Sequence, residues 1–210
     1  MKKLTKVSDD GTTTQYGTCN WQEQYSLYVL QELLDLNGAN WYNEDMTAAE
    51  NVDSEESKEV IEGIKALRTE YGVAPDPTAA GSDTSNSPTA MFLTGQVASI
   101  AIGSYALQEI SQSDINYGVG LFPTFGKDDA DAFMVSSDMK CINSETEHSE
   151  EALLLAEYMS SQDFGIPIYQ TGLWMPNQKA LYEDENISLW FNEDVYPEEW
   201  KNLIPVFYNA

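Results

Sequence analysis

An α/β layered fold is predicted by the order in which helical and strand patterns follow one another along the chain. Residues 22–36 and 54–71 carry apolar side chains at helical spacing, whereas residues 97–102 and 117–121 are short runs typical of buried strands. Helices that alternate with buried strands pack as layers on a largely parallel sheet. With 210 residues and 42% apolar side chains, the chain is long enough to bury a substantial core.

The first predicted helix covers residues 22–36 and is followed by a stop at Asn37-Gly38. Its apolar positions recur every three to four residues and comprise Val29, Leu27, Leu30, Leu33 and Leu34. The stretch 38–53 is polar and irregular and contains the pair Trp41-Tyr42. We expect a loop there.

The second predicted helix covers residues 54–71. Its stripe consists of Val60, Ile64, Leu67 and Tyr71. Asp53 and Glu56 have the spacing of a capping box, and Gly72 suits the left-handed position after a helix. The prolines at 75 and 77 prevent continuation.

A turn-forming run at 74–88 precedes a short predicted helix at 88–94. Ser87 is a good N-cap and Pro88 is favoured at the first helical position. The predicted strand 97–102 and a helix at 105–110 come next. The predicted strand 117–121 ends at Phe122-Pro123.

The last third of the chain begins with a candidate hinge. Residues 126–132 are acidic, and residues 133–142 are expected to be extended, with a turn at Ser137-Asp138. Ser149 is expected to cap a helix over 149–161 whose buried face comprises Ala152, Leu155, Ala156 and Met159. The tail 182–210 has seven acidic residues between Glu183 and Glu199, with Trp190, Phe191 and Trp200 among them.

Composition excludes several classes of partner. The net charge of −25, from 35 acidic and 10 basic residues, repels nucleic-acid phosphates and anionic lipids. Cys19 and Cys141 lie far apart without the spacing of a zinc site or a disulfide framework. The opening residues MKKLTK lack the apolar region of a signal peptide, and no stretch approaches the roughly 20 apolar residues that span a bilayer.

The chain carries no motif for catalysis and none for a cofactor or metal. Its single histidine, His148, lies in a charged run ahead of a predicted helix. A glycosidase needs a pair of positioned carboxylates, but among 35 acidic residues some such pair can always be found, so this feature does not indicate a glycosidase. Aromatic residues at the ends of elements are more informative, because aromatic rings stack on sugar rings. These residues are Trp21, Trp41, Tyr105 and Trp174. Taken singly, each is more often a core residue than a ligand platform.

Five segments together resemble bacterial extracellular solute-binding proteins of the maltose-binding type. Residues 92–105, FLTGQVASIAIGSY, are similar to that family's helix ending in F-x-x-G-x-x-A and strand leading to G-x-W. Residues 115–125, INYGVGLFPTF, resemble the next strand of the family. The other three segments are the helix ending YGVAP at 71–75, the helix starting at Ser149, and GLWMPN at 172–177. Order and spacing both agree.

The resemblance implies a type II periplasmic-binding-protein-like fold, seen here as the C-lobe with part of the returning N-lobe. It divides the chain into a C-lobe domain at 1–125, a hinge crossing with a returning N-lobe segment at 126–180, and an acidic aromatic segment at 181–210. The expected ligand-binding residues are Asn20, Trp21, Trp41, Ser104, Tyr105 and Trp174, and the resemblance itself implies that Trp21 and Tyr105 contact the ligand. Tyr105 stands where the family has Trp, which is a departure from its pattern.

The function implied is solute binding for an ABC importer, with a sugar as ligand and a membrane permease as partner. The family is extracellular or periplasmic, often with a lipid anchor. Alternatives are a peptide, a polyamine or another small solute, a glycosidase remnant, and a fragment that binds nothing. Because the 149–161 helix would pack on the other lobe, we expect an exposed apolar face there, covered by a second copy or a swapped segment.

Overall fold

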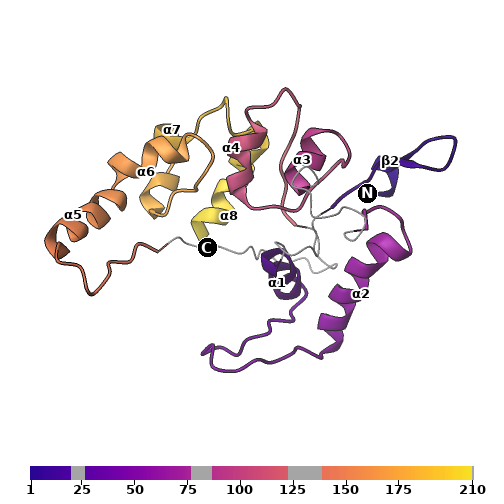
Figure 1. Ribbon diagram of the computed structural model, residues 1–210, viewed down its shortest axis with the longest axis horizontal. Helices are drawn as coiled ribbons and strands as arrows, with labels where there is room; N and C mark the ends of the chain where they lie inside the picture. Colours follow the sequence, from indigo (N-terminus) through magenta and orange to yellow (C-terminus); the bar gives the residue numbers. More distant parts are fainter. Residues whose placement is uncertain (20–26, 77–86, 123–138, 210) are drawn as a thin grey trace. The chain divides into compact units, whose positions relative to one another are not determined.

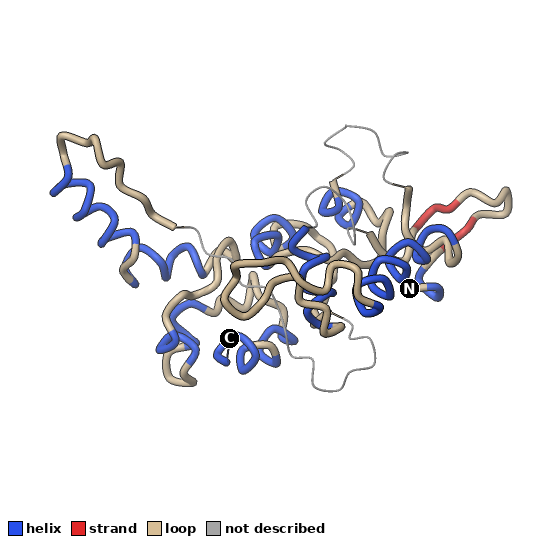
Figure 2. The backbone as a smooth tube through the Cα atoms, turned by 90° about the horizontal axis from the view of Figure 1, so that it is seen from below, coloured by secondary structure: helices blue, strands red, loops and turns tan. Residues whose placement is uncertain are grey.

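The computed structural model describes residues 1–19, 27–76, 87–122 and 139–209, which fall into two compact units (Figure 1). The first contains the described residues up to Ile102 together with Phe122, and the second contains 103–121 and 139–209. Helices and loops make up most of both units (Figure 2). The sequence predictions for 126–132 and for the turn at Ser137-Asp138 lie outside the described residues.

The first unit is organised around α1 (Leu27–Leu36) and α2 (Glu55–Thr69). Their apolar stripes meet in one buried cluster, as the helical spacing predicts. Its members include Val29, Leu33, Leu34, Val60 and Ile64, with Trp41 and Leu67 packed against them. The predicted loop between the helices is confirmed as irregular, with one isolated bridge between Tyr42 and Ala49.

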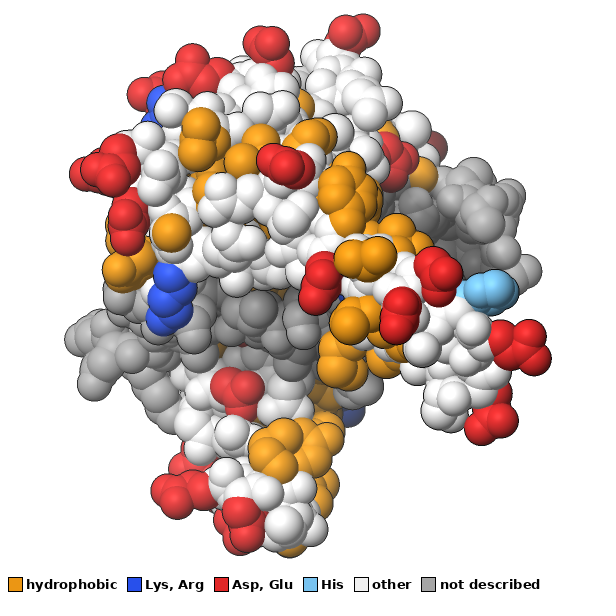
Figure 3. Space-filling view, turned by 90° about the vertical axis from the view of Figure 1, so that its left-hand side faces the viewer, with side chains coloured by type: hydrophobic (Ala, Val, Ile, Leu, Met, Phe, Trp, Pro, Cys, Tyr) orange, Lys and Arg blue, Asp and Glu red, His pale blue; other side chains and the backbone are white. Residues whose placement is uncertain are grey.

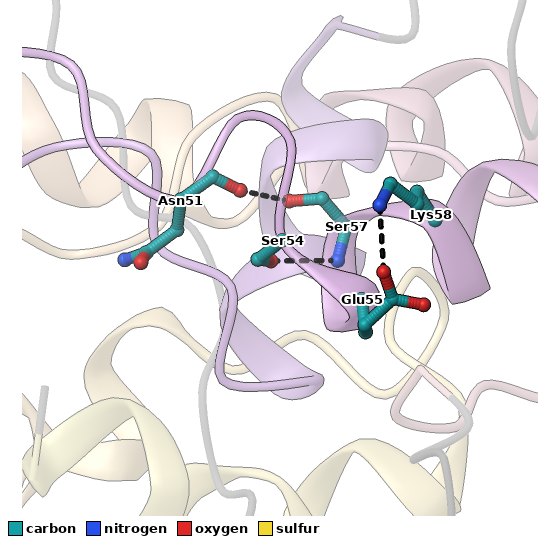
Figure 4. Close-up of polar contacts among 5 residues, drawn as sticks. All are labelled: Asn51, Ser54, Glu55, Ser57 and Lys58. Atoms are coloured by element: carbon teal, nitrogen blue, oxygen red, sulfur yellow. Dashed lines mark hydrogen bonds and ion pairs between the residues drawn. The ribbon is translucent and has the colours of Figure 1, made fainter.

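The N-terminus of α2 is capped one residue later than the sequence suggested. Ser54, and not Asp53, is the N-cap, and its hydroxyl accepts a hydrogen bond from the Ser57 amide at 3.1 Å (Figure 4). The Ser57 hydroxyl in turn donates to the Asn51 carbonyl at 2.6 Å. At the other end, Gly72 adopts the left-handed conformation expected of it, with φ of 61°.

The first unit also holds the regular strands of the described chain, β1 (Lys6–Val7) and β2 (Thr13–Gln15), which pair antiparallel. The predicted strand at 97–102 forms only two isolated parallel bridges, Tyr16 to Val97 and Cys19 to Ile100. Next to it, α3 (Pro88–Leu93) is confirmed, and the Ser87 hydroxyl accepts from the Ala90 amide at 3.1 Å.

The second unit is helical. Its elements are η3 (Ser104–Ala106), α4 (Leu107–Ile110), α5 (Ser149–Met159), α6 (Gln162–Tyr169), η4 (Lys179–Tyr182), α7 (Ile187–Trp190), η5 (Glu198–Asn202) and α8 (Ile204–Asn209). The acidic tail supplies most of its core, which comprises Leu107, Tyr169, Leu181, Trp190, Tyr196, Trp200 and Ile204. The acidic tail is therefore a structural part of this unit.

The segment predicted as a strand at 117–121 forms no regular strand within the described residues. Tyr117 and Val119 pack against the core of the second unit, and the Tyr117 hydroxyl donates to the Val195 carbonyl at 2.9 Å. The prediction of a regular strand is wrong for the described residues, because no neighbouring strand pairs with this segment there.

Helix α5 confirms the predicted helix but corrects two details. The N-cap residue of α5 is His148 and not Ser149 as predicted, and the His148 side chain makes no capping hydrogen bond. Ala152, Ala156 and Met159 are half-buried, whereas Leu155, predicted on the buried face, is exposed. A helix that the sequence did not separate, α6, follows directly, with Ser161 as its N-cap.

Candidate functional site

The residues singled out by sequence are distributed over both units. Ser104, Tyr105 and Trp174 lie in the second unit, and Trp41 lies in the first. Asn20 and Trp21 lie outside the described residues. The second unit therefore holds the part of the predicted site whose local geometry is visible.

Tyr105 lies at the surface with its ring close to the backbone of Gly103. It lies in η3, its side chain is 57% exposed, and a Cβ at Gly103 would stand 2.6 Å from its Cε1 atom. That distance is too short for any real side chain, so the tyrosine ring lies on a bare stretch of backbone. Any substitution at Gly103 would displace the Tyr105 ring. The half-buried Ser104, which lies between the two residues in sequence, adjoins the shifted ring.

The turn at 171–176 packs against the helix that follows Tyr105. Gly172 has φ of 75°, and a Cβ there would lie 3.0 Å from Leu107 Cβ and 2.7 Å from Val195 Cγ1. The Gln108 side-chain Nε2 also donates a hydrogen bond to the Thr171 hydroxyl at 3.3 Å. The structure thus places the turn that begins at Gly172 against the helix that directly follows the segment ending at Tyr105.

Trp174 lies in this turn between a cation and a second ring. The Lys140 ammonium is 4.9 Å from the centroid of the indole, and the Phe164 ring is 6.5 Å away, tilted by 46°. A cation at this distance is attracted by the negative face of the indole. A ligand ring that stacks on that face of Trp174 would have to displace Lys140.

Two tyrosines, the buried Tyr169 and the half-buried Tyr182, hold the turn in place. The Tyr182 hydroxyl donates to the Pro176 carbonyl at 2.7 Å, and the Tyr169 hydroxyl hydrogen-bonds the Asn177 side-chain oxygen at 3.2 Å. Burial raises the pKa of both phenols, so both stay protonated and can donate at neutral pH. Sequence reasoning missed these two residues, because isolated tyrosines carry no pattern that marks them as hydrogen-bond donors to a distant turn.

Trp41 is anchored differently. Its indole nitrogen donates to the Ser57 hydroxyl at 3.1 Å, and its ring packs against the core of the first unit. Its polar atom is therefore committed to α2, and only its ring face remains for contact with a ligand.

The candidate residues carry groups that can bind a polar, ring-shaped ligand. The candidate side chains offer the aromatic faces of Trp41, Tyr105 and Trp174, and their neighbours offer hydroxyl groups and one ammonium. In the described ranges, no group of three or more His, Cys, Asp or Glu residues is placed to hold a metal ion. None of the helices described there has the length and apolarity needed to cross a membrane.

Comparisons with known proteins support the resemblance seen in the sequence. The model of a family described as bacterial extracellular solute-binding protein matches residues 1–194. A solved structure, the maltose/maltodextrin-binding domain MalE from Bdellovibrio bacteriovorus bound to maltotriose, is similar with a TM-score of 0.64 and 17% identity. No match was found among curated proteins.

The structural match shows the fold. It covers 99% of this chain but 57% of the matched chain, so this chain spans little more than half of that protein's length. The type II periplasmic-binding-protein fold predicted from the sequence is confirmed. The small amount of regular sheet among the described residues agrees with a chain that covers part of such a fold.

Proposed function

Because the chain belongs to the family of bacterial extracellular solute-binding proteins, we propose that it binds a carbohydrate, an oligosaccharide in particular, for import by an ABC transporter. The matched structure holds maltotriose, a chain of sugar rings. Rings of this kind present C–H faces that stack on aromatic side chains and hydroxyls that need polar partners.

The observation that carries this proposal is the exposure of Tyr105. A tyrosine that is 57% exposed is not a core residue, and its ring lies close to the backbone of Gly103. We assign Tyr105 as the stacking platform, with Ser104 as a hydrogen-bonding neighbour and Trp174 as a second ring. Asn20, Trp21 and Trp41, which belong to the first unit, are also proposed as ligand-binding residues.

The lobe assignment belongs to the same proposal. Residues 1–125 would form the C-terminal lobe, 126–180 the hinge crossing and returning segment, and 181–210 the acidic aromatic end. The whole protein would act outside the cytoplasm, at the cell surface as a lipoprotein or in the periplasm, and a membrane permease would be its protein partner. Its function is binding and shape change, with no bond made or broken.

Calorimetric titration of the chain with maltotriose, a tripeptide and spermidine tests the proposal. Maltotriose should give a saturable heat with one site per chain, and the other two should not. Saturable binding of spermidine alone would instead favour a polyamine ligand, which the net charge of −25 would attract. No heat with any solute would contradict binding by this chain. Hydrolysis of maltotriose would contradict the binding-only role.

A further inference from the structure

One face of Trp174 in the second unit already holds a cation. The Lys140 ammonium lies 4.9 Å from the centroid of the indole, and Lys140 is exposed while Trp174 is half-buried. The electron-rich face of an indole attracts ammonium groups, and tryptophan attracts them more strongly than tyrosine or phenylalanine does. The chain itself therefore shows which chemical group this face of Trp174 accepts.

Two further rings extend the surface beside Trp174. The Phe164 and Trp174 centroids are 6.5 Å apart, and the Tyr158 and Phe164 rings meet edge to face with centroids 5.6 Å apart. Tyr158 is exposed and Phe164 is half-buried, so both rings have area in contact with solvent. We call Tyr158, Phe164 and Trp174 the aromatic row. Grouped aromatic rings are typical of sites that recognise organic cations.

Acidic side chains accompany the aromatic row. Glu157 directly precedes Tyr158, Asp163 directly precedes Phe164, and both acids are exposed. The segment 141–178 has six acidic residues and no Lys or Arg. Figure 3 shows one face of the molecule, on which red acidic side chains are far more frequent than blue basic ones. A surface of this composition attracts cations and repels anions.

Trp174 is held in place by contacts that do not involve Lys140. The Tyr182 hydroxyl donates to the Pro176 carbonyl at 2.7 Å, in the same turn as Trp174. A cation–π contact made by an exposed lysine is weak, so an incoming ammonium can replace that of Lys140. The indole would keep its position during this exchange.

We propose that the carbohydrate bound by this chain is an amino sugar, whose protonated amine replaces the Lys140 ammonium on Trp174. This inference rests on the proposed function, which supplies the sugar class. A sugar ring with an ammonium group brings a C–H face for stacking and a positive charge that the acidic surface attracts. A neutral sugar would displace Lys140 without supplying a replacement cation. Lys140 is thus a specificity-determining residue, because it competes with the amine of the ligand.

Calorimetric titration with three saccharides tests the proposal. They are a glucosamine trimer at about pH 6, where its amines are protonated, the N-acetylated form of that trimer, and maltotriose. The amine trimer should bind at least about tenfold more tightly than either neutral saccharide. Raising the salt concentration from about 0.05 M to about 0.5 M should weaken only the binding of the amine trimer, because salt screens charged groups.

A pair of lysine variants tests the role of Lys140. Lys140→Gln removes the competing ammonium and should tighten binding of the amine trimer about two- to fivefold, the change that the loss of one exposed cation–π contact corresponds to. The matched control is Lys201→Gln. Lys201 also lies over an aromatic ring, 5.3 Å from the Phe191 centroid, but outside the aromatic row. Its variant loses the same charge and should bind the amine trimer as the unaltered chain does.

The possible outcomes separate this inference from the proposed function. If maltotriose binds but the amine trimer binds no more tightly, the amino-sugar inference fails while the proposed function stands. The inference also fails if Lys140→Gln binds the amine trimer no more tightly than Lys201→Gln does. Spermidine that binds as tightly as the amine trimer, without any binding of maltotriose, would contradict both, since no sugar ring would then be needed. Absence of binding by every solute would likewise contradict both.

Discussion

Helices α2 and α5 begin alike but are packed very differently. Each has two glutamates in its first turn, yet α2 buries Val60 and Ile64 whereas α5 buries no residue. Helix α5, which is the more apolar of the two, is also the more exposed. The stripe of α2 meets the stripe of α1 in the same unit, while the outer side of α5 has no described neighbour of that kind. Burial therefore depends on the presence of a complementary face as well as on the helix's own sequence.

The largest loss of folding stability is expected for a substitution in the buried core of the second unit. Trp190→Ala should lower the free energy of unfolding by about 3–5 kcal/mol, because it empties a fully buried site and removes the hydrogen bond from the indole to the Leu181 carbonyl. Urea unfolding followed by circular dichroism measures this. Trp190→Phe, which keeps a ring, should cost less. An equal cost for both would mean that packing of the ring contributes little there.

A matched pair of substitutions sharpens the comparison of the two helices. Ile64→Ala in α2 should cost about 2–5 kcal/mol of unfolding free energy, because the side chain lies in the core of the first unit. Leu154→Ala in α5 should stay within about 0.5 kcal/mol, since its side chain is already in solvent. Equal losses in thermal or urea melts would show that α5 is covered in solution.

The smallest stability effect concerns the N-cap of α2. Ser54→Ala removes the hydroxyl that accepts from the Ser57 amide and should cost about 1 kcal/mol. Ser54→Asp should restore most of that loss, because an aspartate can cap in the same way. If Asp53→Ala proves more costly than Ser54→Ala in the same melts, the cap is at Asp53, as the sequence suggested.

Much of the fold followed from local patterns. The stripes of α1 and α2, the Ser87 cap of α3 and the left-handed Gly72 depend on neighbours close in sequence, and all were predicted within a few residues. The core built by Trp190, Tyr196 and Trp200 was not predicted. Seven acidic residues surround those rings in the sequence, and only long-range packing separates the exposed acids from the buried rings.

In the candidate site, too, local sequence features could be predicted but contacts between distant segments could not. The aromatic residues at element ends were visible in the sequence, because they stand next to glycines and turns. The contact between the Gly172 turn and Leu107 could not be predicted from sequence. It joins residues 65 positions apart, and it is possible only because Gly172 has no side chain to separate them. The roles of Tyr169 and Tyr182 likewise depend on which carbonyl or amide each hydroxyl reaches.

The central claim is that Tyr105 is a platform for sugar, and one variant tests it with two readings. Tyr105→Ala should weaken maltotriose binding by roughly tenfold, since a stacked ring contributes on the order of 1 kcal/mol. Its melting temperature should hardly change, because the ring is mostly in solvent. Calorimetric titration and thermal melting of this variant beside the unaltered chain give both values. Unchanged sugar affinity together with a large fall in melting temperature would contradict the account.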